Sequence, residues 1–122
     1  PISHNGFVSS IAFSPDNRII ASASTDKTIR LWGRYTKELK RTLNGHSEAV
    51  LSVTFSPDGK IIASGGADKT IRIWNLNALG QPQVLTGHLA AVQAVVISPD
   101  GKTLISGGAD RTLLIWRRIK NN

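Results

Sequence analysis

The chain has 122 residues, of which 40% are hydrophobic, and this length predicts one domain with a modest core. It contains no cysteine, which excludes disulfides and thiolate chemistry and favours an intracellular, cytoplasmic location. No stretch approaches the roughly 18–20 apolar residues of a membrane span, so we expect no membrane partner.

A step of 42 residues repeats along the whole chain. The tryptophans stand at positions 32, 74 and 116, and a histidine, a Pro-Asp pair and a second aspartate recur with the same spacing. Self-similarity at a fixed period of about 20–50 residues is typical of repeat architectures. The sequence therefore consists of one supersecondary unit written three times.

In the middle copy, the first predicted strand is residues 49–55, a run of β-branched and aromatic side chains bounded by polar residues. Residues 56–60 read Ser-Pro-Asp-Gly-Lys, a turn in which the proline presets φ, the aspartate bonds the local backbone and the glycine supplies a positive φ. A second strand over residues 61–66 ends in small residues.

The second half of the copy continues in the same way. Residues 67–70 form the next turn, and residues 71–74 alternate apolar and polar side chains with the period of a strand. After a segment that holds a glycine and a proline, residues 83–85 form a short fourth strand. Four short strands with tight turns in about 40 residues describe one propeller blade.

Short motifs accompany this spacing. Gly-His pairs precede the first strands of copies two and three, and the first copy has Ser3-His4 instead. Together with the Ser-Pro-Asp turn, the recurring aspartate and the tryptophan near the end of the third strand, these residues resemble the WD-repeat β-propeller family. The aspartate that follows the tryptophan in that family is absent from all three copies.

The resemblance covers essentially the whole chain and implies an all-β fold. It predicts β-propeller blades, each a four-stranded antiparallel sheet, with three blades in one WD-repeat segment over residues 1–122. The blades are expected at about residues 4–44, 46–86 and 88–122, the last of them without its outer strand.

Three blades do not close a ring, because propellers typically have about four to eight. The ring is therefore completed either by the remaining blades of a longer propeller or by further copies of this chain. Two copies joined head to tail give six blades and three copies give nine. The equal spacing makes the three repeats interchangeable, which favours a homo-oligomer of this chain.

Each copy also contains His, Ser, Asp and Trp in a fixed order, and the first three residue types are those of a hydrolase triad. Three identical sets at equal spacing, with no nucleophile on a strained elbow, favour a structural role. We therefore predict no enzyme activity and no cofactor, and no metal site because the histidines lie in separate blades.

The resemblance implies that each set is a hydrogen-bonded chain, in which the aspartate links the histidine to a tight turn, the serine bridges and the indole donates. The twelve residues are His4, Ser22, Asp26, Trp32, His46, Ser64, Asp68, Trp74, His88, Ser106, Asp110 and Trp116.

In the family, partners usually bind the narrower face of the ring, at the start of each first strand and at the turn before the recurring aspartate. The corresponding residues here are Phe7, Ser9, Thr25, Ala49, Leu51, Ala67, Leu89, Ala91, Gln93 and Ala109. One aromatic residue among small neighbours suits a protein or peptide ligand. The alternative is that Phe7 and Leu51 pack between blades.

The net charge is +7, and basic residues gather on the predicted rim. They are Arg30, Arg34, Lys37, Lys40 and Arg41, followed near the C-terminus by Arg117, Arg118 and Lys120. A binder of nucleic acid or acidic partners is therefore an alternative function. Tyr35 is the only aromatic residue in the first cluster, which disfavours nucleic acid, and a charged outer strand also protects a sheet edge from aggregation.

From these patterns we predict a non-catalytic protein–protein interaction scaffold. A basic-surface binder is the first alternative. A purely structural or engineered propeller fragment without a ligand is the second.

Overall fold

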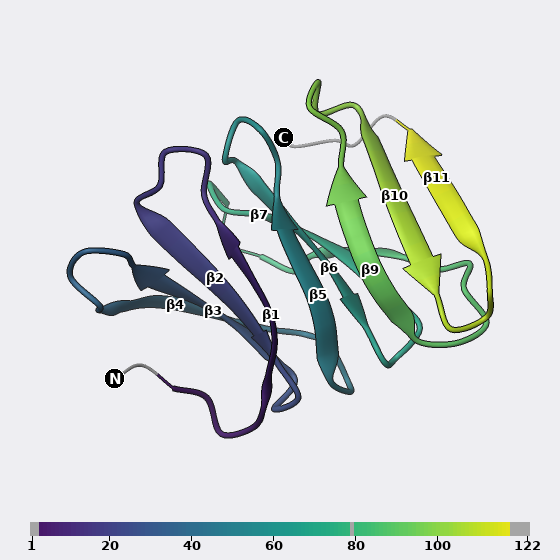
Figure 1. The fold of residues 1–122 in the computed structure, drawn as a ribbon, viewed down its shortest axis with the longest axis horizontal. Coiled ribbons are helices and arrows are strands. Elements are labelled where there is room, and N and C mark those ends of the chain that lie inside the picture. The colour runs from purple at the N-terminus through teal and green to yellow at the C-terminus, as the bar shows by residue number, and fades with distance from the viewer. Residues whose placement is uncertain (1–2, 79, 118–122) are drawn as a thin grey trace.

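The computed structural model describes residues 3–78 and 80–117, and within these ranges the protein has eleven strands and no helix. The strands form three antiparallel sheets that stand side by side in chain order (Figure 1). The described ranges contain no helix long and apolar enough to cross a membrane. The all-β prediction is confirmed.

The first two sheets are four-stranded, and the strand order in each follows the sequence. The first sheet contains β1 (Val8–Phe13), β2 (Ile19–Ser24), β3 (Thr28–Gly33) and β4 (Leu39–Asn44). The second contains β5 (Val50–Phe55), β6 (Ile61–Gly66), β7 (Ile71–Asn75) and β8 (Gln83–Leu85). In this sheet β6 and β8 span the predicted residues, whereas β5 begins and β7 ends one residue later than predicted.

The third sheet has three strands in the described part of the chain. They are β9 (Val92–Ile97), β10 (Thr103–Gly108) and β11 (Leu113–Arg117). Because each sheet begins with its inner strand, β1, β5 and β9 are neighbours along the inner side of the fan (Figure 1).

The Ser-Pro-Asp turns join the first and second strands of each sheet through local hydrogen bonds. In the second sheet, Asp58 accepts from the Ser56 hydroxyl at 2.6 Å and from the Lys60 N–H at 2.9 Å. Gly59 has a φ of 73°, which glycine adopts without the strain of a Cβ. The turn therefore uses the side chains in the way that the sequence predicts.

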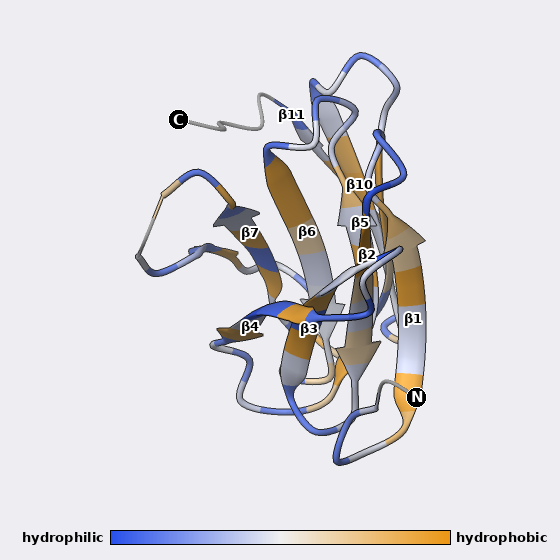
Figure 2. Cartoon of the chain, turned by 90° about the vertical axis from the view of Figure 1, so that its left-hand side faces the viewer, coloured by the Kyte–Doolittle hydropathy of each residue, from blue (hydrophilic) through white to orange (hydrophobic). Residues whose placement is uncertain are grey.

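The hydrophobic core lies between the sheets. One buried cluster joins β2 and β3 to β5, β6 and β7 and includes Leu31, Val53 and Trp74. The other joins β6 and β7 to the third sheet and includes Ile73 and Val95. Figure 2 shows apolar stretches along the strands and hydrophilic residues at the turns between them. Each sheet is thus held mainly by the face that it presents to its neighbour.

Candidate functional site

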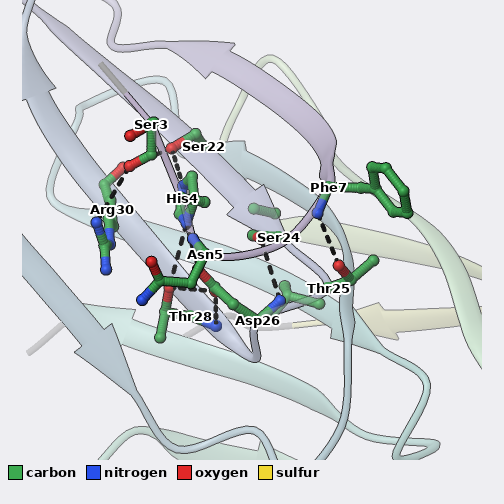
Figure 3. Close-up of polar contacts among 12 residues, drawn as sticks. Ser3, His4, Asn5, Phe7, Ser22, Ser24, Thr25, Asp26, Thr28 and Arg30 are labelled. Carbon is green, nitrogen blue, oxygen red and sulfur yellow. Dashed lines mark hydrogen bonds and ion pairs between the residues drawn. The ribbon is translucent and has the colours of Figure 1, made fainter. Parts of the chain in front are cut away.

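The histidine, serine, aspartate and tryptophan of the first repeat form one hydrogen-bonded set. Nδ1 of His4, which precedes β1, is 2.9 Å from Oδ2 of Asp26 in the β2–β3 turn. Its Nε2 is 2.5 Å from Oγ of Ser22 on β2, and that oxygen accepts a hydrogen bond of 2.8 Å from Nε1 of Trp32 on β3. The set ties the segment before β1 to the β2–β3 turn (Figure 3).

The second repeat builds the same set from His46, Ser64, Asp68 and Trp74. His46 Nδ1 is 2.9 Å from Asp68 Oδ2 and its Nε2 is 2.7 Å from Ser64 Oγ, while Trp74 Nε1 donates to Ser64 Oγ at 2.9 Å. A carboxylate only accepts, so Nδ1 carries the proton and Nε2 accepts from the serine hydroxyl. Each of these side-chain polar groups of the second set then has a partner of the matching kind.

The third repeat completes the pattern. His88 Nδ1 is 3.1 Å from Asp110 Oδ2, and its Nε2 is 2.8 Å from Ser106 Oγ. Trp116 Nε1 donates to the same serine oxygen at 2.9 Å. The structure therefore brings all twelve side chains together, in three separate sets of four.

A threonine belongs to each set and was missed by the sequence reasoning. The hydroxyls of Thr28, Thr70 and Thr112 donate to Oδ1 of the aspartate two residues earlier, at 2.6, 2.7 and 2.7 Å. The signal was present, because these threonines recur with the step of 42 residues. In a single copy, a threonine after Asp-Lys reads only as an ordinary turn residue.

The hydrogen bonds keep the carboxylates charged. Burial alone raises the pKa of Asp68, but hydrogen bonds from Thr70 and His46 outweigh it and hold the pKa below its usual value. The pKa values of Asp26 and Asp110 are lowered as well. Burial lowers the pKa of His46, so its imidazole is neutral at pH 7. The second set is therefore a neutral imidazole held by an ionised carboxylate.

The serines are poorly placed for nucleophilic attack. Ser64 and Ser106 are fully buried, and in every set an indole N–H occupies the serine oxygen. A hollow of about 260 Å³ borders Ser22 and His4, on the face of the first sheet that points away from the second. The matching face of the second sheet is covered by the first sheet, so this hollow is an uncovered packing surface.

The described residues contain no group of three or more His, Cys, Asp or Glu side chains that could hold a metal ion. The three hydrogen-bonded sets therefore serve to hold the turns rigidly in place through buried, paired polar groups.

The ten residues predicted to face a partner lie along one edge of the three sheets, and we call them the turn face. Six of them meet in pairs through backbone hydrogen bonds. The amide groups of Thr25, Ala67 and Ala109 donate to the carbonyl groups of Phe7, Ala49 and Ala91 at 2.9, 2.8 and 2.9 Å.

Three further members of the turn face are extra residues in the inner strands. The register between the first and second strand of each sheet shifts at Ser9, Leu51 and Gln93, which makes each a bulge. Bulges re-aim side chains at the rims of sheets. The Ser9 hydroxyl is directed to the carbonyls of Ala23 and Val50, so it joins the first sheet to the second.

The remaining member, Leu89, is 83% exposed, and Phe7 is 82% exposed. Phe7 therefore does not pack between the sheets of this chain, and Leu51 is half-buried. Beside the turn face, Lys27, Lys69 and Arg111 occupy the tips of the β2–β3, β6–β7 and β10–β11 turns. All three are exposed and have positive φ angles of 77°, 71° and 68°.

The basic rim residues are dispersed into local contacts. Arg30 donates to the Ser3 carbonyl at 3.1 Å, and Arg41 donates to the Leu76 carbonyl at 3.3 Å. Lys40 is 3.6 Å from Glu38.

Arg34 lies over two aromatic rings, those of Phe13 and Tyr35, at 5.2 Å from each. Arg117 ends β11 and is exposed, while Arg118 and Lys120 lie outside the described residues.

Three segments of the chain, residues 2–33, 37–75 and 80–117, match the family model described as WD domain, G-beta repeat. The chain belongs to the WD40 repeat family. The resemblance inferred from the sequence is confirmed. Proteins of the WD40 family generally act as non-catalytic scaffolds for protein interactions.

Nuclear distribution protein PAC1 of Tuber melanosporum is 43% identical over 47 residues, which are 38% of this chain and 10% of that protein. Target of rapamycin complex subunit LST8-1 of Arabidopsis thaliana is 40% identical over 43 residues, which are 35% of this chain and 14% of that protein. The WD40 chain thus spans about a tenth of the length of the curated relatives it matches.

Among solved structures, the one described as "Structure of U3-55K" is similar with a TM-score of 0.89 and 27% identity. The similarity covers 98% of this chain and 40% of that one.

Proposed function

We propose that this WD40 chain is a non-catalytic scaffold that binds a protein or peptide segment on the turn face. The observation that carries the proposal is the pair of exposed apolar side chains, Phe7 and Leu89, on an edge whose backbone is fixed by the buried sets. Large apolar side chains displayed on a rigid edge are suitable anchors for a partner.

The charge of the turn tips indicates the chemistry of the partner. Lys27, Lys69 and Arg111 place one cation beside the turn face in each repeat. Acidic side chains of a ligand would meet these cations, while its apolar side chains contact Phe7 and Leu89. The ligand that fits best is therefore an extended peptide with both acidic and apolar residues.

The relatives support an interaction role. The Arabidopsis thaliana protein LST8-1 is named as a subunit of a complex. An intracellular location fits a chain without cysteine. We also propose that the three sheets belong to a closed ring, which is completed by further blades from one or two more copies of the chain.

Selection of peptides from a displayed random library tests the scaffold role. We expect peptides rich in acidic and apolar residues to bind the wild-type protein and to lose binding to a Phe7→Ser/Leu89→Ser variant. Tyr35→Ser is the control, because Tyr35 is an exposed aromatic residue outside the turn face. Selected peptides that bind the double variant as well as the wild type would refute the assignment of this face.

A further inference from the structure

Two sheet faces of this chain have no neighbouring sheet. The first sheet packs on the second with one face only, and the third sheet likewise packs on the second with one face only. The residues on the two uncovered faces occupy the repeat positions that are buried in the internal contacts. Ile11 is 66% exposed, whereas Val53, one repeat later, is 5% exposed.

The third sheet shows the same contrast on its opposite face. Ile115 is 54% exposed, whereas Ile73, one repeat earlier, is 5% exposed. Leu113 is also exposed and its equivalent, Ile71, is buried. The uncovered faces are therefore the two halves of one sheet-to-sheet contact, which a single chain cannot make with itself while its second sheet separates them.

We infer that these two faces bind each other between two copies of the chain, head to tail, in a six-bladed ring. This inference rests on the ring completion proposed above and adds which surfaces meet and how. Two contacts of the same kind close the ring, because each copy contributes one face to each contact.

A valine-and-glycine contact sets the register. At the internal contact, a Cβ on Gly65 would lie 2.6 Å from Cγ1 of Val92, so the valine sits directly on the glycine. One repeat later, the Cβ position of Gly107 has no atom within 4 Å. Val8 is the equivalent of Val92 and is exposed. Val8 of the second chain therefore fits on Gly107 of the first chain.

Charge complementarity supports the same register. Asp16 of the first repeat and Leu76 of the second line one hollow between their sheets. The equivalent positions on the uncovered faces hold Asp100 and Arg34, and both residues are exposed. The same packing therefore brings Arg34 of the second chain to Asp100, where the contact between the first two sheets has Leu76 beside Asp16.

One feature makes the contact between copies weaker than the internal ones. The Ser10 hydroxyl accepts a hydrogen bond of 3.2 Å from the Val53 N–H, and Ser52 accepts one of 3.2 Å from Val95. The third repeat has Ala94 at this position, so no hydroxyl there can accept from the Ile11 N–H of the second chain. We expect association to be reversible and dependent on concentration.

Sedimentation velocity of the full chain at micromolar concentrations tests the inference. The wild type should sediment with twice the mass of one chain, whereas Ile11→Asp and Ile115→Asp should each weaken association by about a hundredfold or more, because the contact would bury an unpaired charge. Each variant should keep the circular dichroism spectrum of the wild type, since both positions are exposed in the single chain. Val84→Asp, on the second sheet, is the control and should not change the mass.

Mixing the two variants makes the test specific for a head-to-tail contact. The intact third-sheet face of Ile11→Asp meets the intact first-sheet face of Ile115→Asp, so the mixture should regain a two-copy species. Ala94→Ser should strengthen association by about threefold to tenfold per contact, because it restores a hydrogen-bond acceptor.

A wild-type chain that stays monomeric overturns both this inference and completion of the ring by copies. A two-copy or three-copy assembly that is insensitive to Ile11→Asp and Ile115→Asp overturns only the assignment of these faces. If three chains assemble and each of the two variants disrupts that assembly, the six-bladed ring is overturned.

Discussion

Replacing Asp68 by alanine removes the acceptor at the centre of the second hydrogen-bonded set. The carboxylate accepts from His46 Nδ1 at 2.9 Å, from the Ser47 N–H at 3.0 Å, and from the N–H and hydroxyl of Thr70 at 3.1 and 2.7 Å. Its Oδ2 is also 3.7 Å from the Arg72 guanidinium. One side chain thus joins the segment before β5 to the β6–β7 turn.

The magnitude follows from which donors lose their partner. Ser47 is exposed and its N–H can turn to water, so its loss costs little. The buried imidazole of His46 would lose its acceptor, which costs about 1–3 kcal/mol, and the charge-assisted bonds to Thr70 add a further 1 kcal/mol or so. We expect the free energy of unfolding to fall by about 2–4 kcal/mol, which lowers the melting midpoint by roughly 10 °C or more.

Thermal and urea unfolding followed by circular dichroism measure this loss. Glu38→Ala is the matched control, because it removes the same charge from an exposed side chain whose ion pair with Lys40 is worth about 0–1 kcal/mol. If Asp68→Ala were no less stable than Glu38→Ala, the set would contribute nothing beyond its charge and the reasoning would fail.

Substitutions in the second set and at the contacts between sheets give three further predictions. Burial lowers the pKa of His46, so the unfolded chain binds a proton at a higher pH than the folded protein does. The free energy of unfolding should therefore fall as the pH drops below about 6.5. Melting curves of His46→Gln should lack the share of this pH-dependent loss that His46 causes. Ser64→Ala leaves a buried indole N–H without its acceptor and should lower the free energy of unfolding by about 1–3 kcal/mol in urea titrations. Gly65→Ala should cost about 1–3 kcal/mol in the same assay because the new methyl group meets the neighbouring sheet, whereas Gly107→Ala should change the stability of the single chain much less.

The strands were predictable because the step of 42 residues carries their turn and strand residues, and the twelve network residues were predicted from the resemblance to the WD-repeat family. The sequence placed the strands to within a residue in the second sheet, since turn chemistry at Ser56 to Lys60 and the small residues of β6 mark the boundaries. The repeated order of His, Ser, Asp and Trp indicated which residues act together, although a single copy would also have suited a triad.

The bulges and the contacts between sheets were not predictable. A bulge at Ser9 depends on the register of β1 against β2, and nothing in the local sequence distinguishes it from a regular strand residue. The bond from the Val53 N–H to the Ser10 hydroxyl joins residues 43 apart on adjacent sheets, so it depends on how the sheets stack. A pattern along one strand carries no information about which residue of another sheet lies opposite.

The backbone pairing and the buried sets fix the turn face largely independently of the side chains that it displays. The pairing of Ala67 with Ala49, and of Ala109 with Ala91, runs through backbone amides and carbonyls, so it is independent of the side chains. Thr25 and Phe7 share this backbone bond and add one from the Phe7 N–H to the Thr25 hydroxyl. The buried sets fix the ends of these segments through side chains that do not change between repeats. Side chains on the turn face can therefore differ from one repeat to the next without altering the backbone that displays them. It follows that binding should respond to substitutions such as Phe7→Ser at nearly constant stability, whereas substitutions in the sets should lower stability first.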